Sequence, residues 1–262
     1  MNDIQTGKIW DSNAEAWTKL AKAGYDVYRD AVNTPGFLGM LPPVARLRGL
    51  DVGCGYGHNT RLVARRGAGM TGLDISPTFI RYATEDERND PLGIAYTVGS
   101  GQNLPFQEGS FDFVTAFMSL MDMPDPAQAI REIARVLRSG GFMQFSICHP
   151  CFMTRLWKWI RDERGNRIGV LCGDYFDPPQ GDVNEWTFGA APPDARAGVR
   201  PFRVPTFYRT LSDWMNMLLD AGLRIEQLNE PHADEENAAR CPAVADTRIV
   251  AYFLHVRCRK PS

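Results

Sequence analysis

Several classes of protein are excluded by what the sequence lacks. It has no uninterrupted apolar stretch of about 18 residues, and its first segment, MNDIQTGKIWDS, has neither the basic start nor the apolar run of a signal peptide. Its net charge is only −2, which gives no electrostatic reason to expect a nucleic acid or an anionic membrane as a partner. We therefore expect a cytoplasmic protein, a monomer or a homodimer, that recognises a small molecule.

Cysteine is also scarce, since six cysteines are scattered over 262 residues, and this does not look like a disulfide framework. Cys148 and Cys151 form a C-x-x-C pair, but a redox pair is activated at a helix N-terminus, and this pair follows the wrong strand for a redox fold. A zinc site would need two further ligands. Cys172 and His149 are available, but no second pair has ligand spacing. We expect reduced thiols and no metal ion.

From Leu47 onward the sequence alternates apolar, strand-like runs with helical patterns, which is typical of βαβ units around a mainly parallel sheet. The candidate strands are Gly49–Val52, Met70–Asp74, Ile94–Val98, Phe111–Phe117 and Phe142–Cys148. Ser76-Pro77 and Asp125-Pro126 are each an N-cap followed by proline at the first helical position, and Gly140 is expected to end the helix AQAIREIARVLRS. These signals predict a doubly wound α/β fold.

The stretch LDVGCGYGHNT places Gly53, Gly55 and Gly57 between a strand and a helix, which is typical of a cradle for a ligand. The dinucleotide fingerprint would have its third glycine at position 58, where this chain has histidine, so the spacing argues against NAD or FAD. Asp51 would repel a pyrophosphate but attract a ligand with an ammonium and a sulfonium. Asp74, at the end of the next strand, is placed to accept both hydroxyls of a ribose. Together these features point to S-adenosylmethionine.

With these residues the chain resembles the class I S-adenosylmethionine-dependent methyltransferases, in particular the small-molecule branch. The resemblance covers residues 47–148 and includes DVGCGYG, GLDIS, GSGQNLPFQEGSFDFVTAFMSL and IARVLRSGGFMQFSI. It implies a Rossmann-like, mainly parallel seven-stranded sheet whose last strand is antiparallel. The run Arg248–Arg257 could supply that strand.

The resemblance also implies roles for individual residues. Gly53, Cys54 and Gly55 would line the methionine part of the cofactor, with Asp51 beside them. Asp74 would bind the ribose and Ile75 would lie against the adenine. The remaining implied contacts are Gly101, Gln102 and Asn103 beside the adenine, and Phe117 and Met118 near the sulfonium. Apart from the resemblance, Tyr28 and Arg29 on the N-terminal helical arm could close over the cofactor. For Arg29, pairing with the cofactor carboxylate competes with the alternative of a solvated arginine.

One departure concerns the segment after the third strand. Where relatives often have an acid that binds the adenine amino group, this chain reads Val98-Gly99-Ser100-Gly101. Either Ser100 or Gln102 makes that contact, or the backbone does.

Four parts are expected along the chain. Residues 1–46 have apolar and aromatic residues at helical spacing and would form a helical arm; residues 47–149 would form the cofactor-binding core. Residues 210–262 would complete the sheet with a helix ended by Gly222, a strand, and the long final strand TRIVAYFLHVRCRK. Residues 150–209 break the rhythm with prolines, glycines and ten aromatics. A disordered linker is poor in aromatics, so we expect an ordered cap after the fifth strand, over the substrate site.

The aromatic residues of this cap permit two interpretations. They could wall a pocket for an apolar or aromatic acceptor, or each could belong to the core of the cap itself. The residues concerned are Trp157, Trp159, Tyr175, Phe176, Trp186 and Phe188. As a group they favour a bulky organic acceptor over a small polar one.

Methyl transfer needs a general base only if the acceptor must lose a proton. His149 is the best candidate, because it follows the fifth strand at the edge of the cofactor cleft; the alternative is a structural histidine bonded to a loop carbonyl. His232 is a second candidate, and His58 is expected to contact backbone or the cofactor carboxylate. Tyr208-Arg209 would face either substrate or solvent.

The sequence thus predicts a methyltransferase acting on a small organic molecule, first at oxygen, with nitrogen or carbon as alternatives. A nicotinamide-dependent oxidoreductase and a cofactor-binding protein without transfer activity are the rival hypotheses. The acceptor itself is not identified by any motif.

Overall fold

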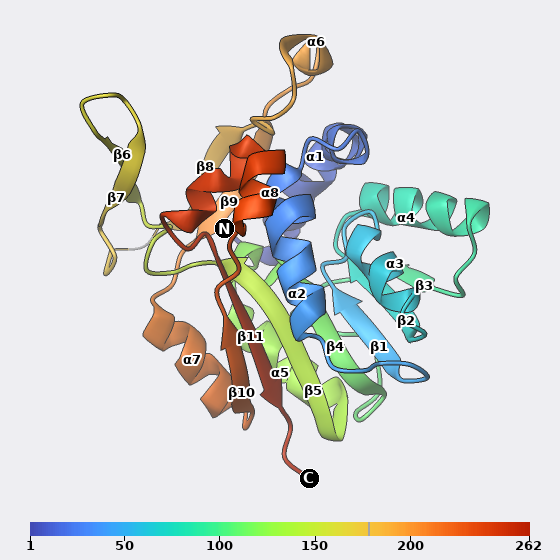
Figure 1. Cartoon of the computed structure of the whole chain (residues 1–262). Coiled ribbons are helices and arrows are strands. Elements are labelled where there is room, and N and C mark those ends of the chain that lie inside the picture. The colour runs from blue at the N-terminus through green and yellow to red at the C-terminus, as the bar shows by residue number, and fades with distance from the viewer. Residues whose placement is uncertain (178) are drawn as a thin grey trace.

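In the computed structural model of the chain, which describes residues 1–177 and 179–262, seven strands form one central sheet in the order β10-β11-β5-β4-β1-β2-β3 (Figure 1). Position 178, in the predicted cap, lies outside the described residues. The strands are β1 (Arg48–Val52), β2 (Gly69–Asp74), β3 (Ala95–Val98), β4 (Phe111–Phe117), β5 (Leu137–Cys148), β10 (Arg224–Asn229) and β11 (Phe253–Arg259). Neighbours from β5 to β3 pair in parallel, whereas β11 is antiparallel to both β5 and β10. The predicted mainly parallel, seven-stranded α/β fold is confirmed.

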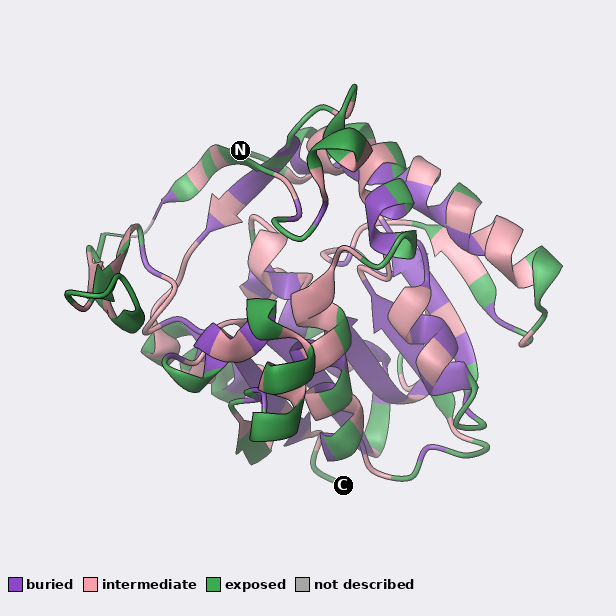
Figure 2. Ribbon diagram, turned by 45° about the horizontal axis from the view of Figure 1, so that its top comes forward, coloured by how far each residue is buried: buried purple, intermediate pink, exposed green. Residues whose placement is uncertain are grey.

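Helices cover both faces of this sheet. On one face α5 (Pro126–Val136) and α7 (Leu211–Asp220) pack against β4, β5 and β11; on the other, α2 (Thr34–Met40) and α3 (His58–Ala64) pack against β2, β4 and β5. Successive side chains of β4 point to opposite faces of the sheet, so β4 contacts helices on both faces. Phe113 belongs to the apolar cluster on one face and Val114 to the cluster on the other. The central strands are accordingly buried (Figure 2). Among the described residues, no helix is both long and apolar enough to span a membrane.

The predicted helix starts are present in the structure. The Ser76 hydroxyl accepts a hydrogen bond from the Phe79 N–H at the start of α4 (Pro77–Asn89), and Asp125 accepts one from the Gln128 N–H at the start of α5. Before the sheet lie α1 (Asp3–Lys22) and a π-helical turn, η1 (Arg29–Asn33), which leads directly into α2. The helices expected before residue 47 are therefore found, but the π turn carried no recognisable sequence signal.

Two predicted boundaries are wrong. Helix α5 ends at Val136 rather than at Gly140, because Leu137 adopts an extended conformation and pairs with Phe111 of β4, so that the chain enters β5 three residues before the glycine. Gly140, at φ +72°, instead makes a bend within β5.

The final strand is also shorter than predicted. Residues 242–248 form a 3₁₀ helix, η3 (Pro242–Arg248), and the strand begins only at Phe253. The reason is Asp246, which is buried and accepts hydrogen bonds from the hydroxyls of Tyr28 and Tyr252. An extended backbone would not place this carboxylate at both partners.

Residues 150–209 form two separate two-stranded sheets. The hairpin of β6 (Leu156–Arg161) and β7 (Arg167–Gly173) projects from the body of the molecule (Figure 1). The pair β8 (Gln180–Trp186) and β9 (Phe202–Phe207), with the short α6 (Pro193–Arg196) between them, packs on α1. The contact is aromatic, because the Trp17 ring of α1 lies 4.7 to 5.5 Å from the rings of Trp186, Phe188 and Phe202. An aromatic cluster is present, as the composition of this region predicted.

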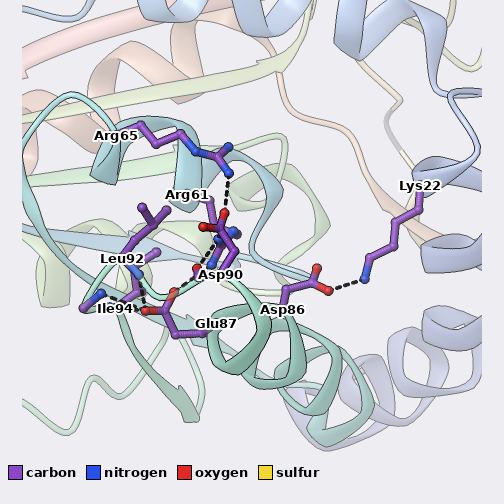
Figure 3. Close-up of polar contacts among 9 residues, drawn as sticks. Lys22, Arg61, Arg65, Asp86, Glu87, Asp90, Leu92 and Ile94 are labelled. Atoms are coloured by element: carbon purple, nitrogen blue, oxygen red, sulfur yellow. Dashed lines mark hydrogen bonds and ion pairs between the residues drawn. The ribbon is translucent and has the colours of Figure 1, made fainter.

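An ion-pair network fixes the helix that follows the glycine loop (Figure 3). Arg61 of α3 is buried and donates to Glu87 of α4 and to Asp90, both at 2.7 Å. The Glu87 carboxylate also accepts from the three backbone N–H groups of residues 92–94, just before β3. Since buried charges are tolerated when paired and hydrogen-bonded, this network holds α3, α4 and β3 in one arrangement.

Candidate active site

A cavity of about 550 Å³ lies at the carboxyl ends of the parallel strands, where open α/β sheets bind ligands. Its floor, as we call it here, consists of the ends of β1, β2 and β4 with the loops that follow them; its roof consists of α1 and the β8–β9 pair. Most of the sequence-predicted cofactor residues line this cavity: Tyr28, Arg29, Asp51, Gly53, Cys54, Gly55, Asp74, Ile75, Gly101, Phe117 and Met118. Gln102, Asn103 and His149 are not among the lining residues.

The glycine loop has a backbone that side chains would obstruct. Gly53 (φ +72°) and Gly57 (φ +84°) adopt left-handed conformations. A Cβ on Gly57 would come within 2.5 Å of the Tyr96 hydroxyl, and one on Gly53 would overlap Ser119. The loop is therefore supported from below by Tyr96 and Ser119 and presents bare backbone to the cavity.

Asp51 lies beneath the loop and is fully buried. Its two carboxylate oxygens accept hydrogen bonds from the hydroxyls of Thr60 (2.5 Å) and Thr115 (2.9 Å), and burial raises its pKa to about 6. The sequence predicts that this acid attracts the ammonium and sulfonium of a ligand. In the structure it lines the cavity but is already held by two hydroxyls, so it contributes a negative potential from a fixed position.

Asp74 bridges the floor and the start of α4. One oxygen accepts from the Gly55 N–H (2.8 Å), the other accepts from the Ser76 N–H (2.9 Å), and burial raises the pKa to about 6. A carboxylate oxygen can accept more than one hydrogen bond, so both oxygens retain capacity for a pair of ligand hydroxyls. The side chain thus both shapes the glycine loop and faces the cavity.

Helix α1 of the roof is attached to the floor by Asp11. Its carboxylate accepts from the Ser76 hydroxyl (2.6 Å) and the Thr78 N–H (2.9 Å), so a residue 65 positions away completes the N-terminal cap of α4. Next to it Gly7 of α1 packs directly against Ile75, leaving no room for a Cβ. Sequence reasoning missed this contact, because no pattern within α1 pairs it with a distant helix start.

The donor set fits S-adenosylmethionine. The bare backbone of Gly53 and Gly55, with Cys54 between them, would accommodate the methionine part, Asp74 the ribose hydroxyls, and Ile75 with Gly101 the adenine. The adenine subsite differs from expectation, because Gln102 uses its side-chain oxygen to accept from the Asp125 N–H (2.9 Å) and Ser100 uses its hydroxyl to accept from the Gln102 N–H (3.0 Å). Neither Ser100 nor Gln102 is a lining residue of the cavity, whereas Gly99 and Gly101 are, which leaves the loop backbone for that contact.

Tyr28 and Arg29 line the cavity but are engaged with protein partners. The Tyr28 hydroxyl donates to Asp246 (2.9 Å), while the Arg29 guanidinium donates to Asp30 (2.7 Å) and to the Tyr56 hydroxyl (2.6 Å). Asp26 lies 3.5 Å from the same guanidinium. Arg29 is therefore not a solvated arginine, and a ligand carboxylate would have to share it with two acids.

Of the three histidine candidates, His58 lines the cavity, whereas His149 and His232 do not. His149 is buried, with Nε2 2.7 Å from Glu230 Oε1 and Nδ1 accepting from the Cys151 N–H, so both ring nitrogens are occupied outside the cavity. His232 is exposed, and it is not a lining residue. His58 lines the cavity, and burial lowers its pKa to about 4, which keeps it neutral. His149 therefore has a structural role in this arrangement, in which its ring is held by Glu230, 81 residues later in the chain.

Arg209 is partly exposed and is not a lining residue of the cavity. It donates to the carbonyls of Phe207 (2.7 Å) and Pro124 (2.8 Å), and so ties the end of β9 to the loop after β4. That loop carries an acid which sequence reasoning did not select.

This acid is Asp122, the last residue of η2 (Leu120–Asp122), directly after β4. It lines the cavity, and within the described part of the chain no hydrogen bond or ion pair reaches its carboxylate. Burial raises the pKa of Asp122 well above its ordinary value, and the buried thiol of Cys148 and the phenol of Tyr208 are its titratable neighbours. The signal was available in the sequence as a single acid in the apolar run MSLMDMP.

Much of the cavity lining is aromatic. Its walls include Trp10 and Trp17 of α1, Trp186 and Phe188 of the β8–β9 pair, and Tyr252 and Phe253 at the start of β11. Of the cap aromatics proposed to wall a pocket, Trp186 and Phe188 do so; Trp157, Trp159, Tyr175 and Phe176 do not line the cavity. The β6–β7 hairpin thus contributes little to the site.

All six cysteines are free thiols, and burial raises the pKa of Cys148 to about 12. Over residues 1–177 and 179–262 the structure contains no group of three or more His, Cys, Asp or Glu side chains that could hold a metal ion.

Comparison with known proteins agrees with this geometry. A family model described as a methyltransferase domain matches residues 50–145. The chain is 38% identical over 148 residues to a ubiquinone biosynthesis O-methyltransferase of Xanthomonas oryzae, covering 52% of this chain and 60% of that protein. It is also 38% identical over 109 residues to a 2-methyl-6-phytyl-1,4-hydroquinone methyltransferase of Synechocystis, covering 41% and 33%. The matches span about half the length of the first curated relatives.

A solved structure extends the similarity to nearly the whole chain. An S-adenosylmethionine-dependent methyltransferase from Mesorhizobium loti superimposes with a TM-score of 0.68 at 27% identity, covering 86% of this chain and 96% of that one. These findings support a class I S-adenosylmethionine-dependent methyltransferase, with the methyltransferase domain at residues 50–145.

Proposed function

We propose that the protein transfers a methyl group from S-adenosylmethionine to an oxygen of a small, largely apolar organic molecule. The observation that carries the proposal is that one cavity joins the glycine loop and Asp74 to a set of aromatic walls, with the carboxylate of Asp122 in the same lining. The names of the two relatives, which concern ubiquinone biosynthesis and a hydroquinone, support an aromatic acceptor with hydroxyl groups.

The chain's own residues would mainly position the reactants. When bound, S-adenosylmethionine supplies a methyl group activated by its sulfonium. Asp74 and the glycine loop would hold the nucleoside and methionine parts, while Phe117 and Met118 would provide an apolar surface beside the reacting centre. The roof, with Trp10 and Trp17, would exclude water and confine the acceptor. Such alignment is a major source of rate enhancement in displacement reactions.

Asp122 would remove the proton of the acceptor hydroxyl. It is a carboxylate in an apolar wall with no protein partner in the described chain, so its basicity is increased by desolvation. The thiol of Cys148 close by is buried, and burial keeps it protonated, so it does not compete as a base at neutral pH. Asp122 therefore takes the role that sequence reasoning had proposed for His149.

Two measurements test this function. Isothermal titration of the purified protein should give saturable binding of S-adenosylmethionine and none of NADH; the reverse would indicate an oxidoreductase. Methyl transfer from labelled cofactor should then be compared for catechol, methylhydroquinone, aniline and indole. We expect transfer to the two phenols, with the product identified as a methyl ether. Binding of the cofactor without transfer to either phenol would contradict the proposed acceptor class.

A further inference from the structure

The π-helical turn brings two cavity residues to the same side of the N-terminal segment. In an α-helix, five residues rotate a side chain by about 500°, so Asn33 would point about 140° away from Tyr28. The π turn has more residues per turn, and the Thr34 N–H donates to the Arg29 carbonyl across five residues. Consequently Tyr28 and Asn33 both line the cavity.

Asn33 is held by a buried histidine that no motif singled out. His255, in β11, is fully buried, and its Nε2 lies 2.6 Å from Asn33 Oδ1. The Asn229 amide donates to Nδ1 on the other side (3.5 Å), which makes Nε2 the protonated nitrogen and the donor to Asn33. Burial lowers the pKa of His255 to about 3, so the ring stays neutral and this arrangement does not change at physiological pH.

These contacts orient the Asn33 amide. Its oxygen is used by His255, whereas no hydrogen bond of its nitrogen is found within the described residues, and this nitrogen is not among the fully buried atoms that lack a partner. Asn33 itself is only 2% exposed, and it is a lining residue of the cavity. The nitrogen therefore remains accessible, and because Asn33 lines the cavity, its two N–H groups are the polar groups this residue offers to a ligand.

The sheet order places Asn33 on the acceptor side. His255 lies on β11, which is separated from β1 and its glycine loop by β5 and β4. Three strand spacings amount to about 14 Å. Along the strands His255 is level with Ser146 of β5, which pairs with Phe117 at the carboxyl end of β4. Asn33 therefore lies beyond the sulfonium side of the cofactor site, near Tyr252 and Phe253.

We propose that Asn33, oriented by His255, donates a hydrogen bond from its amide nitrogen to a second oxygen of the methyl acceptor, distinct from the oxygen that is methylated. This rests on the proposed function, because it assumes an acceptor whose reacting hydroxyl faces Asp122. The acceptor class is then an aromatic molecule with two oxygens, of the catechol or hydroquinone type. His255 is a positioning residue, since it acts only through Asn33.

The test compares probes with two oxygens and with one. Binding of catechol and phenol, and of methylhydroquinone and 3-methylphenol, is measured by quenching of tryptophan fluorescence with the protein saturated with S-adenosylhomocysteine, so that no transfer occurs. Asn33→Leu should weaken binding of the two-oxygen probes about tenfold and change that of the one-oxygen probes less than twofold. Asn89→Leu, at an exposed position at the end of α4, is the matched control and should change neither.

Asn33→Asp provides a second variant with the shape of the parent. It keeps an oxygen for His255 but has no N–H donors, so it should show the same selective loss. An equal loss for both probe types, no loss in either variant, or a parent without preference for two-oxygen probes would overturn the inference. In each of those cases the proposed function would still stand if the parent binds the cofactor and transfers a methyl group to a phenol. If the parent does neither, the proposed function itself is refuted.

Discussion

The floor and the roof of the cavity are built from different kinds of contact. On the floor, Asp51 and Asp74 are held by hydrogen bonds to groups in adjacent strands or in the loops directly after them. In the roof, α1 meets β8–β9 through aromatic rings and through Asn13, whose amide bonds both the N–H and the carbonyl of Arg203. A polar, fixed floor suits a cofactor that does not vary, and an apolar roof made of distant segments suits an acceptor that differs between relatives.

The largest effect is expected where floor and roof meet, at Asp122. Asp122→Asn removes the proposed base while preserving size, and should reduce kcat for catechol methylation by about 10²- to 10⁴-fold with cofactor affinity nearly unchanged. Burial raises the pKa of Asp122, so the parent's rate should rise with pH as the carboxyl loses its proton, above the range of an ordinary aspartate. The variant should lose this rise. Steady-state rates across pH and isothermal titration of the cofactor provide the two readouts.

His149→Gln is the matched comparison, because His149 is bonded to Glu230 outside the cavity. It should retain the pH profile of the parent. A normal rate for Asp122→Asn together with a lost pH dependence in His149→Gln would return the base to His149.

The second prediction isolates the floor. Asp74→Ala should weaken binding of S-adenosylmethionine by about 2–3 kcal/mol, because a charged acceptor for two hydroxyls is lost and the Gly55 N–H loses its partner. Burial raises the pKa of Asp74 and Asp51 to about 6, so affinity in the parent should fall as pH decreases below about 6 and both acids take up protons. Titration calorimetry at pH 7.5 and 5.5 measures both effects, with the exposed Asp220→Ala as control.

A cofactor affinity within twofold of the parent in Asp74→Ala would show that the ribose is held elsewhere. A variant with the full pH dependence of the parent would assign that dependence to Asp51 alone.

The same contrast explains how far the sequence could be interpreted. The floor could be predicted because its features depend on neighbours in the chain or on the alternation of strands and helices. These features are the strand Phe111–Phe117, the caps at Ser76 and Asp125, and the spacing of Gly53, Gly55 and Gly57. The roof and the acceptor side depend on partners far away. His149 is engaged by Glu230 and Asn33 by His255, and no local pattern specifies such a pair.

The boundary errors have a similar origin. Leu137 continues an amphipathic helical pattern, but pairing with β4 makes it extended, so the tertiary contact outweighs the local preference for helix. Residues 248–252 have the composition of a strand. However, Arg248 is the last residue of the 3₁₀ helix η3, and the hydrogen bonds between the buried Asp246 and its tyrosine partners hold that helix in place. Asp122 is the exception, since a lone acid directly after a predicted strand was visible in the sequence.

The smallest effect is expected in the roof, at Asn13. This side chain is buried in α1, and its two hydrogen bonds to Arg203 (2.7 and 2.9 Å) act as one further rung of pairing for β9. Asn13→Ala leaves the Arg203 N–H and carbonyl without partners and should lower the free energy of unfolding by about 1–2 kcal/mol, measured by urea denaturation. Alanine also favours helix more than asparagine does, so Asn89→Ala in α4, which has only this propensity effect, is the appropriate control.

Because the glycine loop and Asp74 do not contact β9, affinity of Asn13→Ala for S-adenosylmethionine should stay within twofold, while binding of methylhydroquinone should weaken several-fold as the aromatic wall loosens. If the affinities for S-adenosylmethionine and methylhydroquinone fall equally, the roof and the floor respond as one unit, and Asp11 transmits the change from α1 to the start of α4.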